Sequence, residues 1–400
     1  MELEYAPRGD GCAASLRLRG DFFGAELRVN TAVVAPGMPP LDSSSGIFYF
    51  TVPTVARYHR LKGLTRNAPP NQNYLRGRDM KRLLAQVGIG ALISFSAHAQ
   101  AAYPDHPVRM VVGFAAGGST DVVARIVANK LGALLGQSVV VENKAGAGGT
   151  IATDVVAKSP ADGYTLLFGT SSHAINATLY KKLPYDPVNA LVPVSVVAGV
   201  PMVLAVNPSV KANTARELVE DIRKNPGKYS YGSAGKGSAV HMAVELLQFQ
   251  EHLKLTHVPF RGASQAIQSV ISGDVQFITD AVSTAAPMIQ SGRLKALAVT
   301  TATRSSVLPD VPTMKEAGYT NYETSLWNMV MVPKGTPAPV IEKLSAALQT
   351  AVKDPEVRQR MEKIGVQPIV DSTPDKAARF VQAETRRWAE VIKAANIELD

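Results

Sequence analysis

The sequence predicts an α/β protein with two lobes, and three observations carry that prediction. From residue 103 onward, short apolar runs alternate with stretches in which apolar residues recur at helical spacing, a pattern typical of α/β architecture. The pattern starts again near residue 229, after a long apolar segment. A chain of 400 residues is also too long for one ordinary hydrophobic core, so two domains are expected.

The first series of elements begins with a buried strand and the helix that follows it. This helix is predicted at about 119–135, because apolar residues recur there every three or four positions. The strands of this series are predicted at 108–115, 138–142, 164–170 and 192–206. The last strand is long, and Gly199 and Pro201 are expected to break it.

The second series and the return of the chain define the predicted lobes. Strands are predicted at 229–233, 256–260, 275–280, 294–301 and 327–332, and helices at about 337–352, 355–364 and 374–396. The last helix keeps an apolar face that needs a surface to pack on. We expect a discontinuous first lobe of residues 103–203 and 323–400, and a second lobe of residues 204–322. Two lobes joined by crossing strands form a cleft, the usual place for a ligand.

Charge and cysteine content exclude several classes of protein. The net charge is +9, but residues 1–99 hold 12 Lys/Arg and 7 Asp/Glu, which leaves 30 and 26 for residues 100–400, a net of +4. No basic stripe interleaved with aromatic residues is present, so nucleic-acid binding is not expected. The only cysteine is Cys12, so the rest of the chain has no disulfide framework or cysteine-ligated zinc site and suits an oxidising compartment.

Residues 80–99 are typical of a secretion signal. Lys81 and Arg82 form a positively charged start, an apolar stretch at 83–95 is too short and too polar to span a membrane, and Ala97-His98-Ala99 fits a cleavage site. The alternative is an amphipathic or buried helix followed by a linker. The signal predicts a periplasmic protein.

A secretion signal cannot act from position 80 of a folded chain. Residues 1–79 lack sustained strand or helix periodicity and run through clusters of Gly, Pro, Arg and Asn. We therefore expect residues 1–79 to be a disordered, non-native extension, with the true start at Met80. The alternative is a genuine, poorly ordered extension.

Two glycine-rich loops carry the functional prediction. The first, at 113–121, ends a strand in small residues and begins a helix, with Ser119 or Thr120 expected as its N-cap. The second, at 231–238, repeats the order of strand, glycine-rich turn, hydroxyl cap and helix. Glycines let a ligand approach backbone N–H groups, and the positive end of a helix dipole favours an anion. One such turn could equally be structural, but a pair, one in each lobe, predicts an anion site between them.

Other polar residues follow strands near these loops. Thr170, Ser171 and Ser172 come after a buried strand, where they would bond a ligand across the cleft or form a solvated loop with a cap. Asp280 ends a strand of the second lobe, where it would accept a hydrogen bond from a ligand ammonium or hydroxyl group, or cap the next helix. Arg261 is the guanidinium nearest these loops, and it either steers anions or is an ordinary surface residue.

The sequence lacks the patterns of nucleotide, metal and catalytic sites. Lys236 is followed by Gly237 and not by Ser or Thr, so the second loop is not a P-loop, and Ile151 occupies the third glycine position of a dinucleotide fingerprint at 146–151. The five histidines after residue 100 show no metal-ligand spacing. No Gly-x-Ser-x-Gly elbow with plausible partners and no cysteine nucleophile occurs there. We expect no catalytic residues, no metal and no cofactor.

Many short motifs along the chain also occur together, in this order, in one family. They include Ala116-Gly117-Gly118-x-x-Asp121 and Ser233-Ala234-Gly235-x-Gly237-Ser238-x-x-His241. The remaining motifs lie at 103–109, 141–149, 162–167, 183–187, 257–260, 292–299 and 308–313. In these motifs the chain resembles the Bug-type receptors, the substrate-binding components of tripartite tricarboxylate transporters. The resemblance covers roughly residues 80–400, with Ala115 standing where the family often has Pro.

The resemblance implies a type II periplasmic-binding-protein fold that closes on its ligand. It implies that a ligand carboxylate is held by amides, hydroxyls and waters of the loops at 116–120 and 233–238. Family ligands include dicarboxylates, tricarboxylates, acidic amino acids, nicotinate-like acids and aromatic acids. The implied partners are the membrane components of a tripartite tricarboxylate transporter or a sensor kinase, and we expect a monomer.

The expected function is capture of a small carboxylate-containing organic anion in the cleft between the lobes. The alternative is a secreted α/β enzyme that acts on a small organic acid in the same cleft. The predicted ligand-binding residues are Ala116, Gly117, Gly118, Ser119, Thr120, Thr170, Ser171, Ser172, Ser233, Ala234, Gly235, Ser238 and Asp280.

Overall fold

The structure, a computed structural model, describes residues 2–5, 14–17, 103–395 and 397 and divides the chain into two units, Met1–Ser94 and Phe95–Asp400. In the first unit, β1 (Glu2–Tyr5) and β2 (Ala14–Arg17) pair as antiparallel strands that the sequence analysis did not predict. The predicted secretion signal lies outside the described residues, as does most of the predicted extension.

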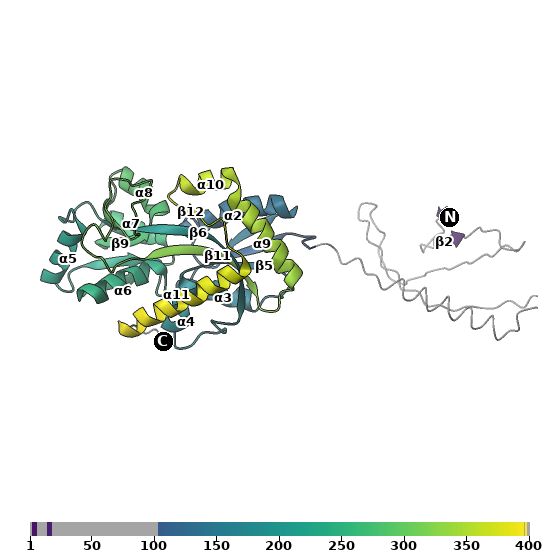
Figure 1. Cartoon of the computed structure of the whole chain (residues 1–400), viewed down its shortest axis with the longest axis horizontal. Coiled ribbons are helices and arrows are strands. Elements are labelled where there is room, and N and C mark those ends of the chain that lie inside the picture. Colours follow the sequence, from purple (N-terminus) through teal and green to yellow (C-terminus); the bar gives the residue numbers. More distant parts are fainter. Residues whose placement is uncertain (1, 6–13, 18–102, 396, 398–400) are drawn as a thin grey trace, which may run out of the picture. The chain divides into compact units, whose positions relative to one another are not determined.

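The second unit is built on one ten-stranded sheet (Figure 1). Its path runs β4–β3–β5–β11–β6–β9–β7–β8, and β10 and β12 also pair with β6. Pairs within β3, β4 and β5 and within β7, β8 and β9 are parallel, whereas β6 and β11 run antiparallel to their neighbours. The strands are β3 (Val108–Val112), β4 (Val139–Asn143), β5 (Thr165–Thr170), β6 (Leu191–Val206), β7 (Ser230–Ser233), β8 (Thr256–Pro259), β9 (Phe277–Ala281), β10 (Lys295–Val299), β11 (Ser325–Pro333) and β12 (Gln367–Pro368).

Strand β6 joins the two halves of this sheet. It pairs with β11 as far as Pro201, which lies opposite Ser325, and with β9 from Met202 onward. The predicted break at Gly199 and Pro201 is wrong, because β6 is a continuous strand of 16 residues. Pro201 lies where β6 exchanges one partner for another, so its missing N–H does not interrupt the middle of either ladder. The predicted lobe boundaries stay a prediction.

The helices cover both faces of the sheet and bury its apolar side chains. In α2, Val123, Val127 and Leu131 are fully buried at a spacing of four residues, which places them on one face of the helix. The helices of the first lobe are α2 (Ser119–Leu135), α3 (Thr150–Ala157), α4 (Ser172–Leu179), α9 (Ala338–Lys353), α10 (Pro355–Glu362) and α11 (Pro374–Ala394), with a short 3-10 turn η1 (Ala147–Gly149). Those of the second lobe are α5 (Ala215–Lys224), α6 (Ala239–Glu251), α7 (Ala263–Ser272) and α8 (Val282–Gln290).

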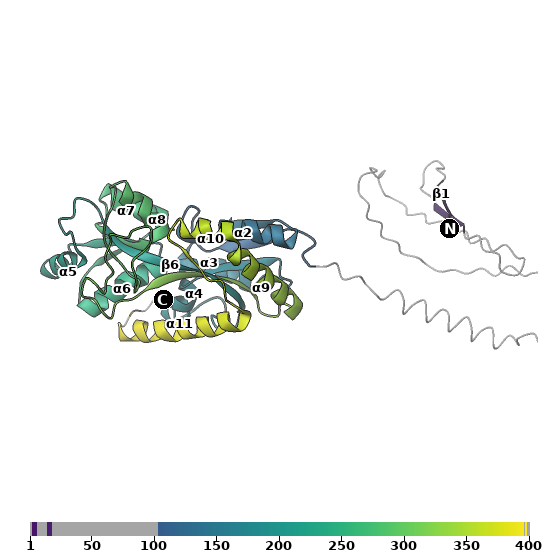
Figure 2. The same ribbon diagram turned by 45° about the horizontal axis from the view of Figure 1, so that its top comes forward.

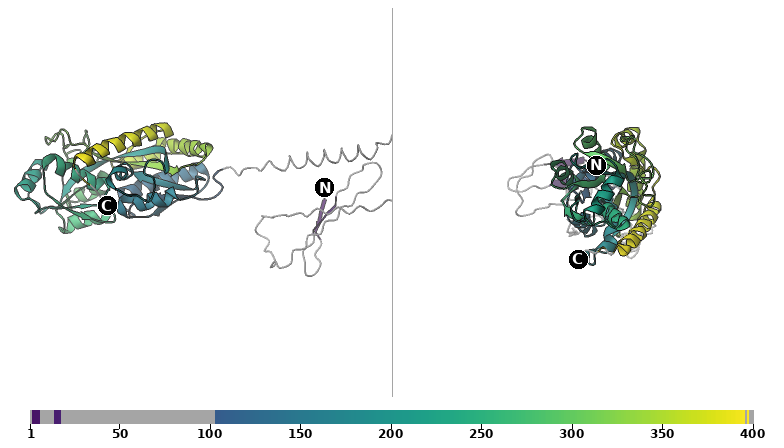
Figure 3. Two further views of the ribbon diagram at one scale, coloured as in Figure 1. Left: turned by 90° about the horizontal axis from the view of Figure 1, so that it is seen from below. Right: turned by 90° about the vertical axis from the view of Figure 1, so that its left-hand side faces the viewer.

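Helix α11 finds the surface that its apolar face requires. It packs on α4 and β6, with Trp388 only 2% exposed, and Trp327 on β11 donates a hydrogen bond from Nε1 to Glu384 over 3.0 Å. Figures 2 and 3 show α11, in yellow, along one side of the sheet, with α10 on the other side of β6 in Figure 2. The prediction that the apolar face of the last helix packs on another surface is confirmed.

The topology brings four helix starts toward the same region. In each lobe, two parallel strands run directly into helices at their carboxyl ends: β3 and β5 lead to α2 and α4, and β7 and β9 lead to α6 and α8. The carboxyl ends of parallel strands are where α/β folds place their ligands.

Candidate ligand-binding site

A small cavity lies between the lobes where these helices begin. Its volume is about 20 Å³, which is room for about one water molecule. It is lined by Phe114, Gly118, Ser119, Thr120, Ser172 and Leu326 of the first lobe and by Ala234, Ser238, Ala239, Val240, Ala263 and Asp280 of the second. Seven of the thirteen predicted site residues therefore line one cavity that both lobes form.

The start of α2 differs from the prediction in its cap. The N-cap is Gly118, and no side chain accepts a hydrogen bond there, so neither Ser119 nor Thr120 is the cap. Instead, the Asp121 side chain provides a hydrogen-bond acceptor for the loop: its Oδ2 accepts the Gly117 N–H over 3.0 Å. The Ser119 hydroxyl is left to accept a hydrogen bond from Ser283 of the second lobe over 2.7 Å.

Asp121 is held by several donors at once. Arg125 Nε lies 3.1 Å from its Oδ1, and the Asn143 amide nitrogen lies 3.0 Å from the same oxygen. Burial opposes ionisation of Asp121, but hydrogen bonds from Arg125, Gly117 and Asn143 outweigh it and lower the pKa of this carboxyl group. Asp121 is therefore ionised and stabilises the conformation of the first loop. It is not among the residues that line the cavity.

The start of α6 matches the prediction. Ser238 is the N-cap, and its hydroxyl accepts the His241 N–H over 3.2 Å. The Met242 N–H donates to the Ser238 carbonyl over 3.0 Å, so the N–H groups of Ala239 and Val240 precede the first intrahelical bond. Both residues line the cavity.

The first turns of α2 and α6, and not the loop glycines, therefore present the donors that suit an anion. In the first loop, the Gly117 N–H binds Asp121. In the second, the Gly235 N–H donates to Ser233 Oγ over 3.1 Å, and the Gly237 N–H donates to His241 Nδ1 over 3.3 Å. The four free first-turn amides belong to cavity-lining residues, namely Ser119, Thr120, Ala239 and Val240. Two helix N-termini facing one cavity favour a negative charge there.

Among the described residues, Asp280 is the only ionisable one that lines this cavity. Its side chain is 1% exposed, and its Oδ2 accepts a hydrogen bond from Thr284 Oγ1 over 2.6 Å. Burial raises its pKa to about 6, against the opposing effect of Thr284 and the Ala281 amide. Asp280 is not the cap of the next helix, because the N-cap of α8 is Ala281 and no side chain accepts a hydrogen bond there. Asp280 lines the cavity, and its contact with a ligand stays a prediction.

Three stacked aromatic rings, those of Tyr231, His257 and His241, lie beside the second glycine-rich loop. His241 and His257 lie with ring centroids 4.1 Å apart, and Tyr231 stacks on His257 at 4.9 Å. Ser233 Oγ lies 2.6 Å from His257 Nε2. Burial, and secondarily the charge of Lys236, lowers the pKa of His257 to about 4. Burial, with His257 and Lys236, lowers that of His241 to about 3.

These histidines lack metal-ligand spacing in the sequence, and no local pattern indicates their contact with the loop. The Ser233–His257 pair resembles a nucleophile and its base in distance alone. Ser233 is fully buried, its hydroxyl accepts the Gly235 N–H, and it is not among the residues that line the cavity. The pair fixes the conformation of the loop, which places Ala234 and Ser238 at the cavity.

The polar run that follows β5 is buried and partly at the cavity. Thr170 Oγ1 accepts the Ser172 N–H over 3.2 Å, which forms the turn into α4. Ser172 lines the cavity, whereas Thr170 lines a neighbouring space with His173 and Asn176, and Ser171 lines neither. Within the described residues, the hydroxyls of Ser171 and Ser172 have no hydrogen-bond partner, so that of Ser172 is available to a bound molecule.

A larger hollow opens beside the cavity. It has a volume of about 610 Å³, and it is lined by Ala147 and Tyr180 from the first lobe and by Gly235, Lys236 and Arg261 from the second, among others. Lys236 and Arg261 are exposed, and neither forms an ion pair with a described residue. Ala234 lines both spaces, so the hollow adjoins the cavity. Ala116 and Gly117 line neither space.

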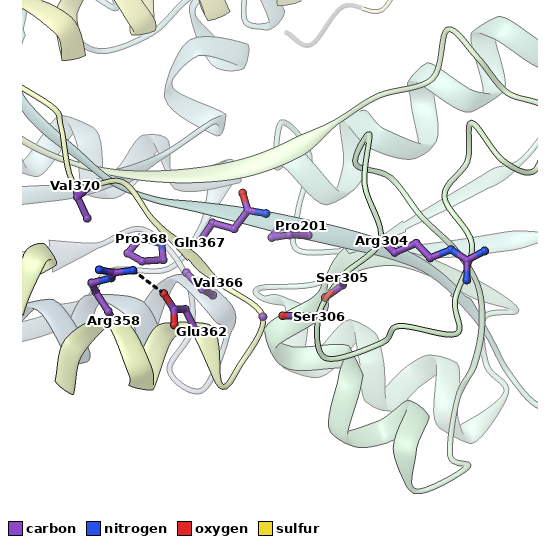
Figure 4. A pocket seen from close by; sticks show the side chains of 11 residues that line it. Pro201, Arg304, Ser305, Ser306, Arg358, Glu362, Val366, Gln367, Pro368 and Val370 are labelled. Carbon is purple, nitrogen blue, oxygen red and sulfur yellow. Dashed lines mark hydrogen bonds and ion pairs between the residues drawn. The ribbon is translucent and has the colours of Figure 1, made fainter. Parts of the chain in front are cut away.

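A third space, of about 330 Å³, lies by β6 and holds none of the predicted site residues. Figure 4 shows Arg358 bound to Glu362 and Arg304 pointing away from that pair. Arg304 binds Glu316 over 3.0 Å, so the charge of each arginine is already balanced. Within the described residues, the hydroxyl of Ser305, which lines this space, has no hydrogen-bond partner.

In the described part of the chain, no group of three or more His, Cys, Asp or Glu side chains is arranged to hold a metal ion. No helix of the described segments combines the length and apolarity needed to cross a membrane.

Comparison with known proteins identifies the family. A model of the tripartite tricarboxylate transporter family receptor, TctC, matches residues 123–397. This chain belongs to that family. The TctC-family receptor described here is 38% identical to protein BugT of Bordetella pertussis over 325 residues, which cover 80% of this chain and 99% of BugT. The predicted resemblance is therefore confirmed.

Solved structures agree with this assignment of the TctC-family receptor. It is similar to the periplasmic binding protein BugD, with a TM-score of 0.72 and 38% identity, over 74% of this chain and 99% of BugD. It is also similar to MatC from Rhodopseudomonas palustris with bound malate, with a TM-score of 0.70 and 33% identity, over 72% of this chain and all of MatC. The predicted fold class, a type II periplasmic-binding-protein fold, is confirmed.

Proposed function

We propose that this TctC-family receptor captures a small organic acid as its carboxylate anion, held between the first turns of α2 and α6. The observation that carries the proposal is the convergence of two helix N-termini on one cavity lined from both lobes. Four amides without intrahelical acceptors face an anion from two sides, and the hydroxyls of Ser172 and Ser238 lie beside them. MatC, a relative at 33% identity, is described with bound malate, which is such an acid.

The proposed ligand enters by separation of the lobes. A cavity of about 20 Å³ is too small for a molecule the size of malate, so the arrangement described here is a closed one. In this closed arrangement the two lobes pack tightly against each other. A Cβ atom added to Gly148 would overlap the Lys236 carbonyl oxygen, and one added to Gly262 would lie 2.8 Å from Ala115 Cβ. The predicted site residues that line the cavity are the proposed ligand contacts.

Membership of the family supports a proposal about location and partners. We infer that the receptor works in the periplasm, where residues 80–99 would direct it, and that it passes its acid to the membrane components of a tripartite tricarboxylate transporter or to a sensor kinase. BugD, a relative of the same fold, is described as periplasmic. The N-terminal sequence of the exported protein tests this location, and a mature protein that begins upstream of residue 97 would contradict it.

A thermal-shift screen tests the proposed ligand class. The panel contains acetate, succinate, adipate, malate, citrate, nicotinate, benzoate and glutamate, each with its neutral amide as control. A molecule that binds only the folded protein raises the melting temperature by mass action, so at least one acid should stabilise the receptor and its amide should not. If no acid on the panel stabilises it, or if amides work as well as acids, the proposal is wrong.

A further inference from the structure

Asp280 lies where the proposed anion binds, although it carries the same sign of charge. It is the penultimate residue of β9, it is 1% exposed, and it lines the cavity together with the first turns of α2 and α6. The other eleven lining residues have no ionisable side chains. A carboxylate bound at the helix starts would therefore meet a second carboxyl group in the same small, buried space.

No cation in the described structure neutralises Asp280. Its partners are the Thr284 hydroxyl and the Ala281 amide. The elements packed against β9 are β6, β7, α6, α7 and α8, and their ionisable groups are Tyr231, His241, Glu245 and Glu251. Tyr231 donates a hydrogen bond to Glu245, His241 accepts one from the Gly237 N–H, and Glu251 pairs with Arg223, so none of the four is paired with Asp280. Across the cleft, Asp121 of α2 is paired with Arg125.

Two carboxyl groups in one buried space cannot both stay ionised at neutral pH. The proton goes to the group with fewer donors. The incoming carboxylate would face four first-turn amides and two helix dipoles, whereas Asp280 has one hydroxyl and one amide. Burial has already raised the pKa of Asp280 to about 6, and a negative charge in the same buried space raises it further, so that Asp280 stays protonated in the complex above neutral pH.

We propose that Asp280 takes up one proton when a carboxylate binds in the cavity, so that the receptor captures the anion together with a proton. The proposal rests on the proposed function. In the complex, the protonated Asp280 donates a hydrogen bond where the ionised form would repel the ligand. Since binding consumes a proton, affinity falls as pH rises, by about tenfold between pH 7 and pH 8.

Titration calorimetry measures the proton directly. The probe is the acid of the panel above that binds most tightly, restricted to acids whose own pKa values lie below 5. The titration is run at pH 7.5 in phosphate and in Tris, because the difference in heat between buffers of different ionisation enthalpy gives the number of protons taken up. The wild-type receptor should take up close to one proton per ligand.

Two variants complete the test. Asp280→Asn keeps the shape and the bond from Thr284 but cannot titrate, so its uptake should fall to near zero and its affinity should not change between pH 6.5 and pH 8. Asp274→Asn removes an exposed carboxylate of the same lobe and should behave like the wild type. Melting curves verify that both variants fold.

The outcomes separate the two proposals. Wild-type binding with no proton uptake, or an uptake that persists in Asp280→Asn, overturns the role of Asp280 and leaves the proposed function intact. Failure of every acid to bind contradicts the proposed function, and with it this inference.

Discussion

Ser283, in the first turn of α8, donates a hydrogen bond to the hydroxyl of Ser119, the first residue of α2, over 2.7 Å. The two residues belong to opposite lobes, so this bond forms only when the lobes are together. It joins the start of α8 to the start of α2, which lines the cavity, and so couples closure to the geometry of the proposed anion site.

Removing this hydroxyl should weaken ligand binding modestly. Ser283→Ala deletes one hydrogen bond of the closed state, worth about 1 kcal/mol, so the dissociation constant should rise about fivefold. Calorimetry with the best acid of the panel measures it. Ser291→Ala, an exposed serine at the end of α8, is the control and should bind like the wild type. An unchanged affinity for Ser283→Ala would show that this bond does not stabilise the closed state.

Gly148 should be needed for closure itself. A methyl group at Gly148 would overlap the Lys236 carbonyl oxygen of the other lobe, so Gly148→Ala should hold the lobes apart and weaken binding at least tenfold. Gly136→Ala is a matched control, since Gly136 also has a positive φ, of 72°, but nothing lies within 4 Å of an added Cβ. Both variants should lose about 1 kcal/mol of folding stability from the left-handed backbone, and only the first should lose affinity. Equal affinities in the two variants would contradict the interlobe packing.

The first-turn amides can be tested one at a time with proline. Proline is tolerated at the first position of a helix, where it removes an N–H that no helical acceptor uses. Ala239→Pro should therefore leave α6 in place but lower affinity about tenfold, the cost of one charge-assisted hydrogen bond. Ala338→Pro makes the same change at the start of α9, away from the cavity, and should bind normally. If Ala239→Pro binds as tightly as the wild type and melts at the same temperature, the amide at that position is not a ligand contact.

The ring stack should make the receptor lose stability in mild acid. The pKa of His257 is lowered to about 4 and that of His241 to about 3, whereas both titrate near 6.5 when unfolded. The unfolded chain therefore binds more protons below pH 6.5, so the free energy of unfolding is highest above that pH and falls as the pH falls toward 4. His257→Gln should flatten this slope in urea unfolding between pH 7 and pH 4.5, whereas His106→Gln, at an exposed position, should leave it unchanged. Parallel slopes for the wild type and His257→Gln would mean that His257 is not buried in its neutral form.

Much of this architecture could be predicted because it depends on local patterns. Helix α2 begins and ends where its apolar spacing predicts, at Ser119 and Leu135, and the strands differ from their predicted bounds by a few residues at most. The two glycine-rich loops were also found from the sequence, because each combines a strand end, glycines and a hydroxyl before an apolar helix. Their meeting at one cavity was an inference from topology.

The missed features depend on contacts between distant residues. The cap of α2 was misassigned because Asp121 reaches back to Gly117 and frees Ser119, a choice that Arg125 and Asn143 stabilise through the folded chain. The stack of His241 on His257 joins α6 to β8, and no local pattern indicates it. The exchange of partners that keeps β6 continuous past Pro201 likewise exists only in the assembled sheet.

The central claim is that a ligand carboxylate lies between the first turns of α2 and α6. A crystal structure of the receptor with the tightest-binding acid of the panel tests it most directly. We predict carboxylate oxygens within about 3.2 Å of the backbone nitrogens of Ser119 or Thr120 on one side and of Ala239 or Val240 on the other. A carboxylate bound instead to the side chains of Lys236 and Arg261 in the adjoining hollow, with the helix starts uncontacted, would contradict the claim.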